Sequence, residues 1–91
     1  SDLSQYAYAQ AGISIPGTSV MQALYCFNNS YTISSSVLQP GDLVFWSKTS
    51  CRCGRWNEIH HVGIYIGNGR IVDASSSMGH VVLFGAMRIG Q

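Results

Sequence analysis

Charged residues are scarce in this sequence. Lys, Arg, Asp and Glu together make up 10% of the 91 residues, and the formal net charge is +1. Nucleic-acid binding requires a concentrated basic surface, so this balance gives no support for a nucleic-acid partner. The apolar fraction, 46%, is too high for a disordered, solvated chain and is sufficient for one small hydrophobic core.

Long apolar runs, internal repeats and domain boundaries are also missing. No stretch approaches the length of a membrane-spanning helix, and no segment recurs along the chain. No secretory signal peptide is visible in these residues. We therefore expect one small domain that occupies residues 1–91 and contains no membrane span.

Cysteine is infrequent, with only Cys26, Cys51 and Cys53 present. An odd number leaves at least one thiol unpaired within this chain, even in an oxidising compartment. Cys51 and Cys53 form a single C-x-C pair, whereas a structural zinc site usually has two such ligand pairs. We therefore favour a disulfide or free thiols over zinc, and we expect no metal and no other cofactor.

Periodicity and capping residues predict two helices in the first third of the chain. Residues 2–11 show helical spacing at Leu3, Tyr6, Ala7 and Gln10, and Gly12 is placed to end the helix. A second, short helix is expected after a cap at Thr18 or Ser19. Residues 26–36 are rich in Ser and Asn and are predicted to be mostly loop.

The remainder of the chain is predicted to form strands. A strand is predicted over 42–46, because its continuous apolar run at 43–46 is typical of a strand buried on both faces. A polar excursion over 47–57 follows, and it contains three of the five basic residues. Further strands are predicted over 61–67, 70–74 and 81–84, with a short addition from the tail 85–91.

The stretch from Glu58 to Ser77 combines a hairpin signal with residues that can do acid–base chemistry. Apolar and other residues alternate through the first strand, and Asn68-Gly69 favours a tight turn because both residues tolerate positive φ. His61 lies near the start of the hairpin, and Asp73 lies on its return strand. An imidazole beside a carboxylate on one sheet face would form an oriented general base.

The hairpin register decides whether His61 and Asp73 share a face. A two-residue loop pairs Asp73 with Ile64 and turns its side chain away from the His61 face. A three-residue loop pairs Asp73 with Gly63, diagonally beside His61, where Gly63 would leave room for both side chains. The pattern does not choose between these registers, and a surface hairpin with an unrelated His and Asp is a third interpretation.

Three motifs, taken in order, cover nearly the whole chain. They are Y-A-Y-A-Q-A-G-I-S-I-P-G-T-S (6–19), L-Q-P-G-D-L-V-F-W (38–46) and H-V-G-I-Y-I-G-N-G-R-I-V-D-A-S (61–75). Together they resemble the NlpC/P60 family, the papain-like cysteine peptidases of bacterial cell-wall turnover. The resemblance implies an α+β fold, with an N-terminal catalytic helix packed on an antiparallel sheet of about five or six strands.

The resemblance also implies a Cys-His pair that is oriented by a third polar residue. It assigns the catalytic histidine to His61 and the third residue to Asp73, where many family members have histidine. The family's helix begins with a motif like D-C-S-G-L, and aligning its leucine with Leu3 places Ser1 and Asp2 on the serine and glycine. The nucleophilic cysteine then falls immediately before Ser1, so residues 1–91 would lack both it and the family's N-terminal segment.

The implied chemistry gives each residue a role. A thiol at a helix N-terminus beside a histidine has a lowered pKa and forms the attacking thiolate. His61 would accept and return the proton, while Asp73 would hold the imidazole in the useful tautomer. Backbone N–H groups at Ser1 and Asp2 would face the oxyanion. Trp56, at the end of the polar excursion, is expected to form an aromatic wall for substrate or to pack in the fold.

By resemblance, the function is that of a bacterial cell-wall hydrolase. The expected enzyme is a cysteine endopeptidase that cuts peptidoglycan stem peptides between γ-linked D-glutamate and a diamino acid. The protein is expected to be secreted or wall-associated and to contain other domains. Two alternatives stay open: a non-catalytic wall-binding module that has lost its nucleophile, and an amidase or acyltransferase on the same scaffold.

Overall fold

The computed structural model describes residues 2–47, 56–72 and 80–86, and these form two α-helices, two short 3-10 helices and four strands. In chain order the elements are α1 (Asp2–Gln10), α2 (Ser19–Asn28), η1 (Ser35–Val37), β1 (Leu43–Ser47), η2 (Trp56–Glu58), β2 (Ile59–Gly67), β3 (Arg70–Val72) and β4 (His80–Gly85).

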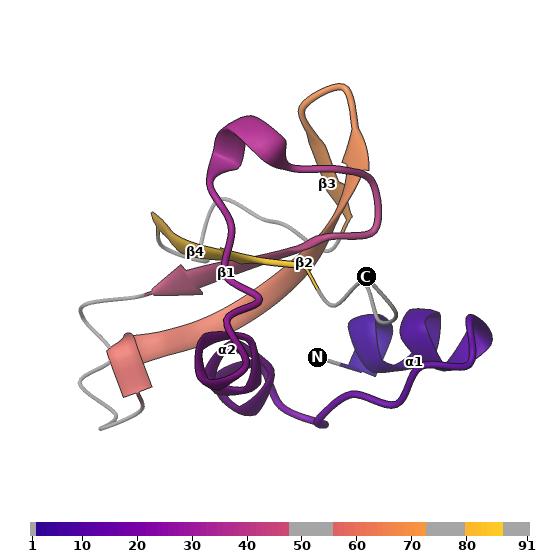
Figure 1. The fold of residues 1–91 in the computed structure, drawn as a ribbon, viewed down its shortest axis with the longest axis horizontal. Helices are drawn as coiled ribbons and strands as arrows, with labels where there is room; N and C mark the ends of the chain where they lie inside the picture. Colours follow the sequence, from indigo (N-terminus) through magenta and orange to yellow (C-terminus); the bar gives the residue numbers. More distant parts are fainter. Residues whose placement is uncertain (1, 48–55, 73–79, 87–91) are drawn as a thin grey trace.

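The strands form one antiparallel sheet in the order β3-β2-β1-β4. Figure 1 shows both helices on the same side of this sheet, with α2 beneath its middle and α1 toward one end. This arrangement confirms the predicted α+β class. The described ranges contain four strands, compared with the five or six that the family resemblance implied.

The central strand β1 is buried along its whole length, as its continuous apolar run predicted. Leu43, Val44 and Phe45 have no exposed surface, because β2 and β4 pair with the two edges of β1 and side chains cover both of its faces. The main hydrophobic cluster lies between the sheet and the helices, and it comprises Ile15, Ala23, Cys26, Leu43, Phe45, Ile59, Val62 and Ile64.

Helix α2 begins as predicted but continues further than expected. The Oγ1 atom of Thr18 accepts a hydrogen bond from the backbone N–H of Met21, which is the expected N-terminal cap. The prediction that a loop begins at residue 26 was wrong, because the helix continues to Asn28. Cys26 is fully buried against the sheet. Its packing stabilises the last turn of the helix, although the residues that follow Cys26 are mostly polar and favour a loop.

Helix α1 forms where it was predicted, but it presents a different face to the core. Tyr6 is 65% exposed, whereas Ser4 is only 2% exposed. The Ser4 hydroxyl donates a hydrogen bond to Oε1 of Gln22, and Nε2 of the same glutamine donates to the carbonyl of Pro16. Because a buried amide must be satisfied, this polar pair rather than apolar spacing orients the helix.

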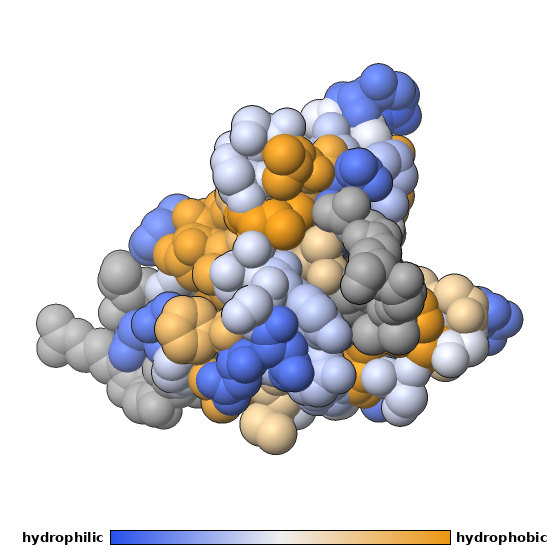
Figure 2. All heavy atoms as spheres, viewed as in Figure 1, coloured by the Kyte–Doolittle hydropathy of each residue, from blue (hydrophilic) through white to orange (hydrophobic). Residues whose placement is uncertain are grey.

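The surface retains a considerable amount of apolar area, in keeping with the scarcity of charge. Large hydrophobic side chains such as Val37, Ile66 and Val82 are 53%, 50% and 40% exposed. Figure 2 shows hydrophobic atoms on the surface around η1 and along the nearby end of the sheet. Within the residues that the structure describes, neither α-helix is long and apolar enough to cross a membrane.

Replacing Gly85 with alanine tests the packing of β4 against α2. A Cβ atom at Gly85 would lie 2.5 Å from Sγ of Cys26 and 3.3 Å from Cε2 of Phe45, so the core would have to shift. We expect Gly85→Ala to lower the free energy of unfolding by about 1–3 kcal/mol, measured by urea denaturation.

A double variant and a second glycine provide the controls. Combining Gly85→Ala with Cys26→Ala removes the closest clash. The double variant should therefore lose less free energy of unfolding than the sum of the losses in the two single variants. Gly17→Ala meets only ordinary contacts, of 3.5 Å or more, with Gln5, and should be neutral or slightly stabilising. Strict additivity of Gly85→Ala and Cys26→Ala would contradict this packing.

Candidate active site

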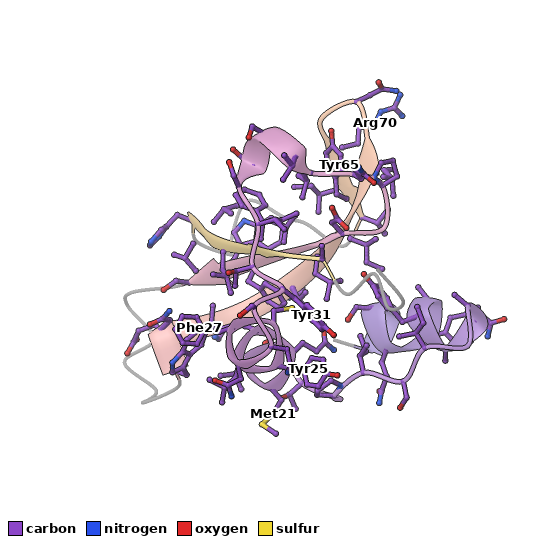
Figure 3. All side chains as sticks on the ribbon, in the orientation of Figure 1. Met21, Tyr25, Phe27, Tyr31, Tyr65 and Arg70 are labelled. Atoms are coloured by element: carbon purple, nitrogen blue, oxygen red, sulfur yellow. The ribbon has the colours of Figure 1, made fainter. Side chains whose placement is uncertain are left out.

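The β2–β3 hairpin has the tight turn that the sequence predicted. Asn68 and Gly69 both have positive φ, +54° and +73°, as a type I′ turn requires. The backbone N–H of Gly69 donates a 3.1 Å hydrogen bond to the hydroxyl of Tyr65 and so ties the turn to β2. Figure 3 shows Tyr65 and Arg70 at this end of the hairpin, away from the labelled residues of α2.

The hairpin register combines features of both predicted alternatives. Gly67 pairs with Arg70 across the two-residue turn, but the register then shifts between Tyr65 and Gly67. Beyond this shift Ile64 lies opposite Val72, which is the pairing that the three-residue loop predicted. One extra residue on β2 therefore changes which face of the sheet the return strand presents.

Several of the predicted site residues lie outside the described part of the chain. Asp73 and Ser1 both fall outside it, so their predicted roles stay predictions. Asp2 is the first residue of α1. The polar excursion 47–57 is described only at its two ends, Ser47 and 56–57.

His61 lies directly opposite Trp46 on the neighbouring strand β1. The centroids of the two rings are 6.0 Å apart, and the rings are tilted by 56°. The β1–β2 register shifts immediately beyond this pair, where His60 is the extra residue on β2. His61, the candidate base, is half-buried and lies close to the end of the β1–β2 ladder. The indole of Trp46 forms one side of its environment.

Strand alternation assigns His61 to one face of the sheet. Val62 and Ile64 belong to the cluster that packs with the helices, so His61 and Trp46 lie on the opposite face. The described turns of α1 pack on the Val62 side, where Ala7 and Tyr8 contact the core. The family resemblance places His61 beside the beginning of the first helix, and this stays a prediction because residue 1 lies outside the described part of the chain.

Gly63 does not leave the open space that the sequence suggested. A Cβ atom there would lie 2.8 Å from Cγ2 of Ile71, 2.8 Å from the carbonyl oxygen of Val72 and 3.1 Å from Cζ3 of Trp46. Glycine is needed because β3 and the indole come this close to the β2 backbone. The resulting tight contact fixes β3 against the strand that carries His61.

Trp56 has a clear packing role. Its ring lies 5.2 Å from that of Phe27, centroid to centroid, and it packs against the hydrophobic cluster. Tyr25 and Tyr31 form another aromatic pair, with centroids 6.0 Å apart. Figure 3 shows Phe27 on one side of α2 and Tyr25 with Tyr31 on the other. The structure thus supports packing for Trp56, while the predicted substrate contact stays a prediction.

Glu58 is a residue that the sequence analysis did not single out. Asn57 and Glu58 both have positive φ, +51° and +55°, although neither is glycine. The Oε2 atom of Glu58 is buried and has no hydrogen-bond partner among the described residues. No simple sequence signal exposes either feature, because both arise from how the chain turns into β2.

Cys26 is buried and does not have the properties of a nucleophile. Desolvation by burial, with a further contribution from the charge of Asp42, raises the pKa of its thiol from 9.0 to about 12. A reactive cysteine needs the opposite shift, toward the thiolate. Within the described ranges, no three His, Cys, Asp or Glu side chains gather as they would around a metal ion.

Comparison with known proteins gives one family match. The model of the NlpC/P60 family matches residues 1–87. The probable endopeptidase p60 of Listeria grayi is 42% identical over 77 residues, which cover 85% of this chain and 13% of that protein.

Two further relatives come from other bacteria. The bifunctional muramidase/DL-endopeptidase CwlT of Bacillus subtilis is 38% identical over 77 residues, 85% of this chain and 21% of that protein. A probable endopeptidase of Corynebacterium glutamicum is 38% identical over 78 residues, 85% of this chain and 30% of that protein. The chain therefore spans less than a third of each of these relatives.

Thiol labelling tests the assignment of Cys26 as a buried structural residue. We expect iodoacetamide at pH 8 to leave Cys26 unmodified in the folded protein and to modify it in urea, as followed by peptide mass spectrometry. Because folding raises the pKa, the thiol contributes stability below pH 9 that is lost as the pH rises toward 12. Rapid labelling of Cys26 in the folded protein would contradict the assignment.

Proposed function

The chain belongs to the NlpC/P60 family, and on this premise we propose that the protein that contains it is a cysteine endopeptidase of the bacterial cell wall. The family match extends over 87 of 91 residues, and the relatives above carry endopeptidase in their names. Because the chain spans only part of those relatives, the activity of the whole protein is part of this proposal. The proposed substrate is the peptide stem of peptidoglycan, cut between γ-linked D-glutamate and a diamino acid.

The register of the β2–β3 ladder is the observation that carries the assignment of the base. Ile64 lies opposite Val72, and the ladder, continued by one residue, would bring Asp73 opposite Gly63. Side chains at diagonal positions of an antiparallel pair are within reach of each other, so Asp73 would adjoin His61. This supports an oriented imidazole rather than an incidental pair of polar residues.

In the proposed mechanism the nucleophile is the cysteine expected immediately before Ser1. His61 takes the thiol proton as the thiolate attacks the peptide carbonyl, and it later gives a proton to the leaving amine. Asp73 orients the ring and stabilises its charged form. For these groups to meet, the beginning of α1 must approach the end of the ladder where His61 lies.

The surroundings of His61 suit this role. The tilted indole of Trp46 lies beside the imidazole, with the ring centroids 6.0 Å apart, and offers it an aromatic surface on one side. The segment 47–57 connects β1 to β2 along the chain, and we propose that it contributes to the rim of the site. Its basic residues Arg52 and Arg55 would then face the carboxylates of the stem peptide.

Localisation and partners follow from the same premise. A substrate in the peptidoglycan layer requires a secreted or wall-associated protein, and longer relatives indicate that further domains accompany this one. These domains would direct the peptidase to the wall, whereas the domain that contains residues 1–91 would supply the peptide-cutting step together with the expected cysteine.

Substitutions at His61 and Asp73 in the full-length protein test the proposal. Oriented general-base catalysis contributes roughly 10²–10⁴-fold to the rate, so His61→Ala should forfeit most of this factor and Asp73→Ala part of it. Asp73→Asn keeps a hydrogen-bond acceptor but removes the charge, and an intermediate loss is expected. Turnover of a defined muropeptide, with mass-spectrometric identification of the products, gives the measurement.

His80→Ala is the matched control, because His80 is an exposed histidine at the start of β4. It should retain wild-type turnover and thermal stability. Wild-type rates for Asp73→Ala would exclude Asp73 as the third catalytic residue. Products cut outside the peptide stem would contradict the endopeptidase assignment and favour an amidase.

A further inference from the structure

The carboxylate of Glu58 is in an unusual environment. Its Oε2 atom is buried and has no hydrogen-bond partner among the described residues. Buried polar atoms in folded proteins are nearly always paired, because removing a polar or charged group from water without compensation is costly. The Oε2 atom of Glu58 is thus a buried acceptor whose hydrogen-bonding capacity is unmet among the described residues.

The backbone holds this carboxylate in place. Asn57 and Glu58 are consecutive left-handed residues, a conformation uncommon outside glycine and kept only where the surroundings impose it. On one side Trp56 is packed against Phe27, and on the other Ile59 is fully buried. The two anchored neighbours therefore fix the backbone turn that carries Glu58.

Glu58 is also close to the candidate base along the sequence. It precedes His61 by three residues, so their Cα atoms are at most about 10 Å apart. The other carboxylate whose side chain the structure describes, Asp42, is only 1% exposed, and its Oδ2 accepts a 2.8 Å hydrogen bond from the backbone N–H of Gln39. Of these two described carboxylates, Glu58 is thus the one with an unpaired oxygen, and it lies three residues before His61.

We propose that Glu58 determines substrate specificity by binding the side-chain ammonium group of the diamino acid in the stem peptide. The inference rests on the proposed function, which places that residue on the leaving-group side of the cut bond. A diamino acid bound there would extend its amine a few ångströms from His61, within the span to Glu58. An ammonium group supplies both the positive charge and the N–H donors that the buried oxygen lacks.

Binding of paired peptides tests the inference independently of catalysis. The ligands are a synthetic γ-D-glutamyl-L-lysine peptide and its Nε-acetyl derivative, and the full-length protein carries His61→Ala so that neither is consumed. Adding Glu58→Gln should weaken binding of the free-amine peptide by about tenfold, the effect of losing one hydrogen bond to a charged group. It should leave affinity for the acetylated peptide unchanged, as measured by calorimetry.

The controls separate recognition from folding. Asn57→Gly keeps the left-handed turn without altering the carboxylate, so it should preserve the preference for the free amine. Equal effects of Glu58→Gln on both peptides, or no preference for the free amine before that change, would overturn the inference. Binding with the predicted preference, but without turnover when His61 is restored, would reject the proposed function and leave the role of Glu58 intact.

Discussion

The pairing of β1 on both of its edges is the constraint on which the rest of the structure depends. Its apolar side chains are withdrawn from water on both faces, so β2 and β4 must satisfy its backbone groups. The β1–β2 register then places His61 opposite Trp46, and β2 in turn carries β3. The geometry around the candidate base is thus set by the most buried strand of the domain.

A second constraint is polar. Gln22 is fully buried in α2 and is satisfied by Ser4 of α1 and by the carbonyl of Pro16. The Tyr8 hydroxyl donates to the carbonyl of Gly41, which ties α1 to the turn before β1. Apolar packing alone would allow α1 to rotate, whereas these bonds specify one orientation. The first helix therefore has a defined position relative to the sheet.

The elements governed by local rules could be predicted from the sequence. The buried strand, the Asn68-Gly69 turn and the start of α2 each depend on a few adjacent residues whose backbone preferences agree with the fold. The assignment of His61 as the base rests on a motif of the family, so it stays a prediction. The face of α1 and the length of α2 could not be predicted, because buried contacts of Ser4 and Cys26 with distant residues decide them.

The register shift between Tyr65 and Gly67 is the clearest example of a feature that could not be predicted from the sequence. Either loop length was compatible with the pattern, and the structure combines a two-residue turn with one extra residue on β2. The positive φ of Glu58 is similar in kind, since glutamate does not favour the left-handed region as glycine does. Such features depend on long-range pairing and packing, yet they decide which side chains can meet at the site.

Our central claim is that this register brings Asp73 beside His61, and cross-strand NMR contacts test it most directly. In a labelled sample of the full-length protein, we expect backbone NOEs that connect residue 73 with Gly63. The imidazole resonances of His61 should also change when Asp73 is replaced by alanine. NOEs that connect residue 73 with Ile64 instead would put its side chain on the opposite face and contradict the account.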